Sequence, residues 1–333
     1  MIRWTSFRWL ARVMVPAAFL LVCAGFGPAA IAQDFPNRPI TWVVGFAPGG
    51  ISDLGTRFAA KIFGEKLGTQ VIVDNKPGAG GIVAAEYVAR AKPDGYTLFY
   101  GSNGPLGTFR YIYKKLPFDP LNSFTLIHGF GSSPLILVVP TSSPFKSIKE
   151  LVNYAAANPG KLTFASVGTG SAAHLTGELL ASETGTKFNH VPYKGSSPAM
   201  VDVIAGRIDF IFDYSIVVKP LIDSGKLRAL ATTGSVRLPG HPDVLTTVEL
   251  GYPGVQFTAW ATLVGPAGMP PAVTARIASA FNETLKDPAV VKYHDDQGVT
   301  LMVDVGGERL REFIIKEQAK FKVLVERSGA AEP

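Results

Sequence analysis

The chain has 333 residues, of which 47% are hydrophobic and 17% charged, and it carries 35 glycines, 25 prolines and one cysteine. This length corresponds to about two domains with a sizeable core, and the composition excludes a disordered chain, a coiled coil and a disulfide-rich scaffold. The formal net charge of +6 would by itself suggest nucleic acid or an acidic ligand as a partner.

Residues 1–32 have the three parts of a secretory signal peptide. Three arginines precede an apolar, uncharged run over 13–26, and Ala30 and Ala32 then offer a cleavage site. The apolar run has about 14 residues, fewer than the roughly 20 that span a bilayer. We therefore predict a periplasmic protein whose signal peptide is cleaved near Ala32.

Cleavage changes how the composition is interpreted. It removes three arginines and no acid, which leaves 29 basic and 26 acidic residues and a net charge of +3. It also removes Cys23, and the bulky Val22 before it argues against lipidation. In the mature chain Lys114 and Lys115 form the one adjacent basic pair, so no nucleic-acid partner is expected.

Strands and helices alternate along the first part of the mature chain. The expected elements are strands at 40–45, 70–74 and 96–100, and helices at 54–67 and 82–91. Ser52 or Asp53 is expected to cap the first of these helices.

The same alternation then restarts. The expected elements are strands at 135–139, 162–166, 188–191, 208–212, 227–232 and 257–264, and helices at 148–157, 172–184, 197–205, 273–285, 289–295 and 308–325. Such repetition predicts parallel sheets with helices on both faces. Two α/β units predict a bilobed protein with its ligand between the lobes, since ligands of open α/β sheets lie outside the carboxyl ends of the strands.

Glycine-rich turns lead into helices in both halves. Residues 49–53 form one such turn, and residues 168–171 repeat it with the hydroxyls of Thr169 and Ser171 added. A helix N-terminus carries unpaired N–H groups and a partial positive charge, and glycine lets a ligand reach that backbone. The turns therefore predict carboxylate seats, with an ordinary strand-to-helix turn as the alternative. For a third copy at 78–81, the packing alternative has equal weight.

Signatures of other chemistries are weak. No Gly-Lys-Ser/Thr follows these turns, and Gly168-x-Gly170-x-x-Ala173 fits the dinucleotide pattern only loosely. Residues 128–131, His-Gly-Phe-Gly, resemble an oxyanion loop, but no Gly-x-Ser-x-Gly elbow and no metal-binding histidine spacing accompany them. No cofactor or metal is expected. His174, in the first turn of its helix, is a candidate ligand contact, with capping or packing as the alternative.

Several segments, in order along the chain, carry a family resemblance. They are residues 46–53 with Arg57, 74–81, 93–98, 168–175 and 191–195, followed by 209–213 and Trp260. Together they cover essentially the whole mature chain, and they resemble the Bug-type receptors, the extracytoplasmic solute-binding proteins of tripartite tricarboxylate transporters.

The resemblance implies a fold and a boundary for each lobe. The fold would be the two-lobed α/β periplasmic-binding-protein fold, type II or Venus flytrap, in which each lobe is a mixed sheet flanked by helices. One lobe would comprise residues 33–133 plus 258–333, and the other residues 134–257.

The resemblance also implies a site in which the loops 46–53 and 166–174 clamp carboxylate groups through backbone N–H groups, hydroxyls and ordered water. The ligand-binding residues expected on this basis are Phe46, Pro48, Gly49, Gly50, Ser52, Asp53, Ser102, Asn103, Ser166, Thr169, Gly170, Ser171, His174, Tyr193, Lys194, Gly195 and Asp213. Phe46 would form an apolar wall, whereas Asp53 would cap its helix. Either Asp53 or Asp213 would hold a water or a ligand ammonium group. Departures from the family pattern near this cleft occur at Ala47, Gly55, Thr56, Ser196, Ala261 and Thr262.

We therefore expect a monomeric, non-enzymatic receptor that captures a small carboxylate for the permease subunits of a tripartite tricarboxylate-type transporter. A dicarboxylate, an amino acid and an aromatic acid remain open as ligands. Two other classes also remain open. One is a receptor that senses its ligand for a signalling partner, and the other is a periplasmic enzyme acting on carboxylates.

Overall fold

The structure is a computed structural model that describes Met1 and residues 35–328. The chain divides into a short unit, Met1–Asn37, and a large unit, Arg38–Pro333, and every element below belongs to the large unit. The predicted signal peptide lies, apart from Met1, outside the described residues. Among the helices of the described residues, none has the length and apolarity of a membrane span.

Six strands form the first sheet, in the order β11-β4-β10-β3-β1-β2. Their bounds are β1 (Ile40–Val44), β2 (Val71–Asn75), β3 (Thr97–Ser102), β4 (Phe124–Pro134), β10 (Thr258–Pro266) and β11 (Thr300–Leu301). β1 lies between β2 and β3 and is parallel to both. β10 is antiparallel to β3 and β4, and β11 is antiparallel to β4. Trp42, Val43 and Val44 of β1 are buried without alternation, as in strands that are covered on both faces.

Five strands form the second sheet, in the order β7-β6-β8-β5-β9. Their bounds are β5 (Ile136–Pro140), β6 (Thr163–Ser166), β7 (Asn189–Pro192), β8 (Phe210–Asp213) and β9 (Leu227–Thr232). β6 is parallel to β7 and β8, whereas β5 is antiparallel to β8 and β9. The chain thus passes from the first sheet to the second between β4 and β5, and returns between β9 and β10.

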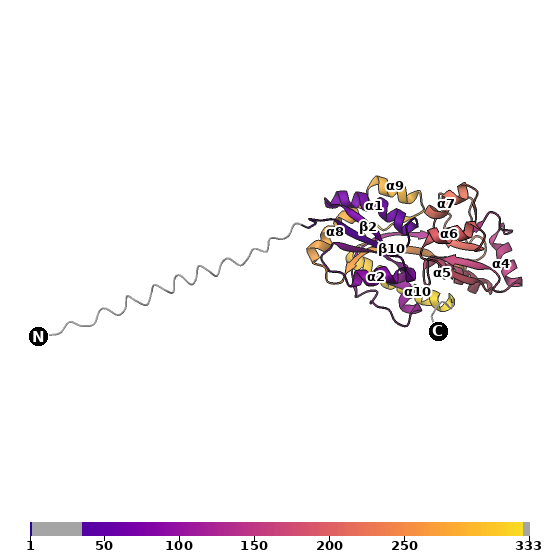
Figure 1. Ribbon diagram of the computed structural model, residues 1–333, viewed down its shortest axis with the longest axis horizontal. Coiled ribbons are helices and arrows are strands. Elements are labelled where there is room, and N and C mark those ends of the chain that lie inside the picture. The colour runs from indigo at the N-terminus through magenta and orange to yellow at the C-terminus, as the bar shows by residue number, and fades with distance from the viewer. Residues whose placement is uncertain (2–34, 329–333) are drawn as a thin grey trace. The chain divides into compact units, whose positions relative to one another are not determined.

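Helices cover both sheets (Figure 1). Their bounds are α1 (Ile51–Leu67), α2 (Ile82–Ala89), α3 (Phe109–Ile112), α4 (Ile148–Ala157), α5 (Ala172–Thr184), α6 (Ser196–Ile204), α7 (Ser215–Asp223), α8 (Pro271–Leu285), α9 (Pro288–Asp295) and α10 (Gly307–Ser328), with short turns η1 (Ala79–Gly81), η2 (Gly104–Thr108) and η3 (Pro253–Val255). We call the first sheet with α1, α2, α8 and α9 the first lobe, and the second sheet with α4 to α7 the second lobe.

α10 connects the hydrophobic interiors of the two lobes. It packs against β4, η2 and α5, which lie on opposite sides of the boundary between the lobes. Its side chains Ile314 and Phe321 belong to one cluster of buried residues that also contains Phe99 of the first sheet, Leu179 of α5 and Phe210 of the second sheet. The two lobes therefore share a continuous core on this side.

Local capping explains why two helices lie where the sequence predicts them. α4 starts after Ser147, whose Oγ accepts the N–H of Glu150 (3.2 Å), and α5 starts after Ser171, whose Oγ accepts the N–H of His174 (3.3 Å). α5 ends at Thr184 and is capped by Gly185, which has a left-handed φ of 64°. The predicted bounds of both helices are confirmed.

Three expectations from the sequence need correction. The sheets are mixed instead of parallel, because β4, β5, β9 and β10 run antiparallel to their neighbours. The His-Gly-Phe-Gly segment, residues 128–131, lies within the eleven-residue strand β4 and forms no loop. The expected cap of α1 also differs, since Gly50 occupies the N-cap position and neither Ser52 nor Asp53 does.

Candidate functional site

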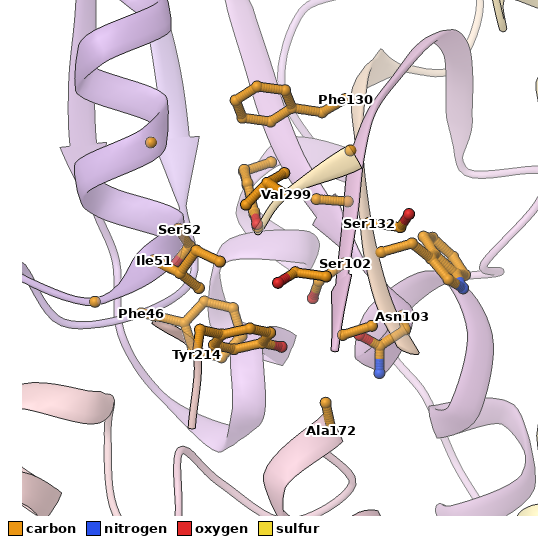
Figure 2. Close-up of a pocket in the computed structure, with 18 of the residues that line it drawn as sticks. Phe46, Ile51, Ser52, Ser102, Asn103, Phe130, Ser132, Ala172, Tyr214 and Val299 are labelled. Carbon is orange, nitrogen blue, oxygen red and sulfur yellow. The ribbon is translucent and has the colours of Figure 1, made fainter. Parts of the chain in front are cut away.

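A pocket lies where the turns of the two lobes meet, with about 890 Å³ of space when its open mouth is included. The first lobe lines it with the turn after β1, the end of β3, parts of β4 and β10, and the segment between α9 and β11. The second lobe contributes the turn after β6 and the starts of α6 and α7 (Figure 2). The site thus lies at the carboxyl ends of β1, β3, β6 and β8, as the α/β rule predicts.

Four helices begin at the wall of this pocket. Gly50 and Ser52 belong to the start of α1, Ser171 to α5, Ser196 to α6 and Tyr214 to α7. The first N–H groups of a helix have no intrahelical partner, and they carry the positive end of the helix dipole. The pocket therefore collects partial positive charge from backbone alone.

Polar groups and apolar rings share the remaining wall. Hydroxyls come from Ser102 and Ser132, and the Nδ2 of Asn103 is buried without a hydrogen-bond partner among the described residues. Figure 2 shows the Asn103 amide directed toward the start of α5 at Ala172. The apolar part of the wall includes Phe46, Ile51, Tyr100, Phe130, Val299 and Trp260. No Lys, Arg, Asp or Glu side chain from the described part of the chain lines the pocket.

Hydrogen bonds join the lobes beside the pocket. The N–H of Ala47 donates to the carbonyl oxygen of Lys194 (3.0 Å), and the hydroxyl of Ser197 donates to that of Pro48 (2.7 Å). Further inside, the hydroxyl of Thr108 donates to the carbonyl oxygen of Gly170 (2.9 Å). The lobes are therefore in contact both at residues 47–48 and at residues 108 and 170.

Glycines allow these close approaches. A Cβ on Gly168, which has φ +130°, would lie 2.8 Å from the Cα of Gly80, and a Cβ on Gly195 would lie 2.9 Å from the backbone nitrogen of Ala47. A Cβ on Gly80 would lie 2.8 Å from the carbonyl oxygen of Thr169. The third glycine-rich turn, residues 78–81, is thus packed against the second lobe, and its Gly80 also reaches the pocket wall.

Asp53 holds the first turn instead of facing the pocket. It is 2% exposed, its Oδ2 accepts the N–H of Gly49 (2.9 Å), and its Oδ1 accepts Nε of Arg57 (2.9 Å). Arg57 also donates to Oδ1 of Asn75 (2.7 Å). The carboxylate is therefore paired, and the turn that carries it is tied to the end of β2.

His174 holds the second turn in a comparable way. Its Nδ1 accepts the N–H of Gly170 (3.0 Å), so the proton of the neutral ring is on Nε2. The ring stacks on His190 at a centroid distance of 4.0 Å, and the hydroxyl of Ser166 is bonded to Nε2 of His190 (2.6 Å) and to Gly168. Burial lowers the pKa of His174 to about 3, with His190 as a further cause, and burial lowers the pKa of His190 to about 4.

The remaining predicted residues lie behind the wall. The Tyr193 hydroxyl donates to Asp202 (2.6 Å), and burial followed by this hydrogen bond raises the pKa of Tyr193 to about 12. Asp213 is 1% exposed, accepts the N–H of Tyr214 through Oδ1 (2.8 Å), and has an Oδ2 with no partner among residues 35–328. Burial raises the pKa of Asp213 to about 6, although Ser196 and the Tyr214 N–H act in the opposite direction.

The predicted residues thus fall into two groups. Those that line the pocket are Phe46, Gly50, Ser52, Ser102, Asn103 and Ser171. Those that lie in the supporting turns or behind them are Pro48, Gly49, Asp53, Ser166, Thr169, Gly170, His174, Tyr193, Lys194, Gly195 and Asp213.

Sequence reasoning missed part of the wall. Ser196 and Tyr214 each follow a predicted residue by one position, so the sequence indicated these two segments but pointed to the neighbouring residue in each. Phe130, His294 and Val299 line the pocket from β4, α9 and the segment after α9. Phe130 belongs to the His-Gly-Phe-Gly segment that resembles an oxyanion loop, and nothing in the sequence near His294 and Val299 indicates a site. Among the described residues, no group of three His, Cys, Asp or Glu is placed to hold a metal ion.

Comparisons with known proteins show the family of this chain. The family described as TctC, the tripartite tricarboxylate transporter family receptor, matches residues 56–330. BugT of Bordetella pertussis is 33% identical over 322 residues, which are 96% of this chain and 98% of BugT.

Solved structures of related proteins share the fold of this chain. The periplasmic binding protein BugD superposes with a TM-score of 0.86 at 32% identity, covering 90% of this chain and 100% of BugD. Rpa4515 of Rhodopseudomonas palustris, solved with adipate, has a TM-score of 0.85 at 31% identity (89% and 99% covered). MatC of the same organism, solved with malate, has a TM-score of 0.83 at 30% identity (87% and 100% covered). The fold is the two-lobed periplasmic-binding-protein fold, and the chain belongs to the receptor family of the tripartite tricarboxylate transporters, with Bug-type proteins as its relatives.

Proposed function

We propose that this protein is a periplasmic receptor that captures a small carboxylate and delivers it to the permease subunits of a tripartite tricarboxylate-type transporter. One observation carries the proposal. Four helix N-termini surround a pocket that no charged side chain of the described residues lines. Such a site suits an anion, because backbone N–H groups and helix dipoles stabilise negative charge without a basic side chain.

Two further observations support a carboxylate as the ligand. The unpaired Nδ2 of Asn103 is a buried donor, and a ligand oxygen would relieve the cost of leaving it unpaired, about 1–3 kcal/mol. The related proteins Rpa4515 and MatC were solved with adipate and malate, and both molecules are carboxylates.

Capture would proceed by closure of two lobes, for which we propose the bounds 33–133 plus 258–333 and 134–257. The division of the strands between the two sheets supports these bounds, since the chain changes sheet between β4 and β5 and between β9 and β10. A ligand that contacts α1 and α5 together binds the closed form more tightly than the open form, so it shifts the population toward the closed form. The hydrogen bonds of Ala47 and Ser197 between the lobes would then stabilise only the closed form.

The export signal predicted at residues 1–32 supports periplasmic capture, and the receptor family supports a permease as partner. We propose that the mature protein acts as a monomer and without catalysis. A ligand recovered chemically unchanged after long incubation is the expected result, whereas turnover would indicate the enzyme alternative. Deletion of the gene should abolish growth on the transported acid. Unchanged growth with loss of a transcriptional response would favour the sensor alternative.

Isothermal titration calorimetry of the mature protein with mono- and dicarboxylates tests the proposal directly. Gly50→Val should weaken the binding of every carboxylate at least about a hundredfold, because a Cβ at Gly50 would lie 3.4 Å from Ser196 Oγ, and both residues line the pocket. The matched control is Leu54→Val, which places the same branched side chain on an exposed position of α1. Equal affinities in wild type and Gly50→Val would refute the proposed seat.

A further inference from the structure

His294 occupies an apolar end of the pocket. It lies in the last turn of α9, is 3% exposed, and lines the pocket together with Gly55, Phe130 and Val299. Its ring meets the ring of Phe130 edge-on at a centroid distance of 5.4 Å. Figure 2 shows Phe130 and Val299 at the opposite end of the pocket from Ala172 and Tyr214, which mark the starts of α5 and α7.

The hydrogen bonding of His294 fixes its proton. Nδ1 lies 2.8 Å from the carbonyl oxygen of Val290. A carbonyl oxygen only accepts hydrogen bonds, so Nδ1 is the protonated nitrogen. Burial lowers the pKa of His294, although the Val290 carbonyl and Asp295 act in the opposite direction. The ring is therefore neutral, and Nε2 presents a lone pair.

That lone pair has no partner among residues 35–328. Nε2 faces α1 at Gly55, where an added Cβ would lie 3.4 Å away. The side chains of Phe130 and Val299 have no hydrogen-bond donor, and Gly55 has no side chain. A donor that enters the pocket would therefore satisfy this buried acceptor.

We propose that His294 determines ligand specificity by accepting a hydrogen bond from a hydroxyl or neutral N–H group at the end of the ligand remote from its carboxylate. The ligand is then a monocarboxylate with an apolar body and a terminal donor. A second carboxylate would face the lone pair of Nε2, and a terminal ammonium would find no acidic side chain in the wall of the pocket. The placement of the ligand carboxylate at the helix N-termini rests on the proposed function.

Matched ligands separate the two ends of the pocket. The probes are benzoate, 4-hydroxybenzoate and terephthalate as one series, and hexanoate, 6-hydroxyhexanoate and adipate as another, titrated calorimetrically into the mature protein. In at least one series the hydroxylated acid should bind at least about tenfold more tightly than the unsubstituted acid. The dicarboxylate should bind more weakly than the hydroxylated acid.

Three variants test the residue itself. His294→Leu removes the acceptor and should reduce the preference to within about twofold, with the unsubstituted acid still bound. Gly55→Ala places a methyl group against Nε2 without changing the histidine, and it should reduce the preference in the same way. This variant provides the test if His294→Leu does not fold. His294→Gln offers an amide oxygen and should retain part of the preference. Lys292→Leu is the control, because Lys292 is an exposed residue of α9 and lies outside the pocket wall.

The outcomes separate the two proposals. If carboxylates bind but no hydroxylated acid is preferred, if a dicarboxylate binds best, or if the preference survives both His294→Leu and Gly55→Ala, His294 has no role in recognition. If His294→Gln loses the preference as completely as His294→Leu does, the acceptor role is also contradicted. If none of the six acids binds to the wild-type protein, the proposed function fails and this inference fails with it.

Discussion

The first and second turns of the site, residues 46–52 and 167–171, are built on the same plan with different chemistry. In each of these two segments, a glycine with positive φ donates its backbone N–H to the side chain four residues later, which is the third residue of the following helix. In the first turn Gly49 donates to the carboxylate of Asp53, and in the second Gly170 donates to the imidazole of His174.

The difference concerns charge and packing. The carboxylate of Asp53 is paired with Arg57, whereas His174 is neutral and its ring stacks on that of His190. In both turns the side chain of the third helical residue holds the backbone of the turn, and the net charge that it adds to the turn is small. The partial positive charge of the helix N-termini therefore remains available to a ligand anion.

Replacing Gly49 and Gly170 by alanine should show the largest difference in packing between the two turns. Gly170→Ala forces a left-handed φ of +74° on alanine and places its Cβ 2.6 Å from the ring of Phe109, so we expect a loss of about 3 kcal/mol in the free energy of unfolding. In Gly49→Ala, at φ +88°, the Cβ meets the Oγ of Ser197, which can rotate away, so we expect a loss of about 1–2 kcal/mol.

Urea denaturation of both variants measures these values. Gly225→Ala is the control, since Gly225 also has a left-handed φ, +70°, but nothing lies within 4 Å of its added Cβ. It should report the backbone cost alone. Equal losses at Gly170 and Gly225 would mean that packing does not distinguish the second turn.

Removing the carboxylate tests the first turn. Asp53→Ala leaves the N–H of Gly49 without its acceptor and leaves Arg57 paired only with Asn75, so we expect a loss of about 1–3 kcal/mol in the free energy of unfolding. Asp53→Asn keeps one acceptor oxygen and should lose about half as much. Glu65→Ala, on the exposed face of α1, is the control and should change stability by less than about 0.5 kcal/mol.

Ligand affinity gives a second measure of the same variant. If Asp53 holds the turn and does not touch the ligand, Asp53→Asn should change carboxylate affinity only slightly, and Asp53→Ala should weaken it. Tighter binding in both variants would instead mean that the carboxylate repels the ligand.

The elements predicted well are those with local signals. α4 and α5 begin after serine caps, and α4 ends at Ala157, with Asn158 as its C-terminal cap and Pro159 and Gly160 directly after it. A few neighbouring residues therefore determine the bounds of both helices. β4 has no such signal, because its glycines and serines are typical of a loop. Its strand conformation depends on pairing with β10, where Pro134 lies opposite Thr258, more than a hundred residues along the chain.

The site shows the same division. Gly50 and Ser171 could be predicted, since glycine and hydroxyl residues before a helix have a local physical meaning. His294 could not, because it reaches the pocket through the packing of α9 on α1, where Tyr293 stacks on Phe58 at 4.0 Å. The residues that form the anion seat are thus encoded locally, whereas those proposed to select the ligand body depend on tertiary packing.

Acid should affect the second turn through its histidines. The pKa of His174 is about 3 and that of His190 about 4 in the native protein, against about 6.5 when unfolded. Below pH 6.5 the unfolded chain therefore binds more protons, so the free energy of unfolding should fall as the pH drops from 6.5 toward 4. Each neutral histidine contributes on the order of 1 kcal/mol per pH unit.

Comparison with a variant isolates this effect. His174→Gln keeps an oxygen that can accept the Gly170 N–H but removes one titrating group, so its stability should fall less steeply between pH 6.5 and pH 4. Asp213 acts with the opposite sign between about pH 6 and pH 4, because its raised pKa makes the native state bind a proton first. That contribution is present in both proteins and cancels in the difference. Parallel stability curves for wild type and His174→Gln would show that the second turn is not held by a neutral imidazole, and its likeness to the first turn would then be one of backbone alone.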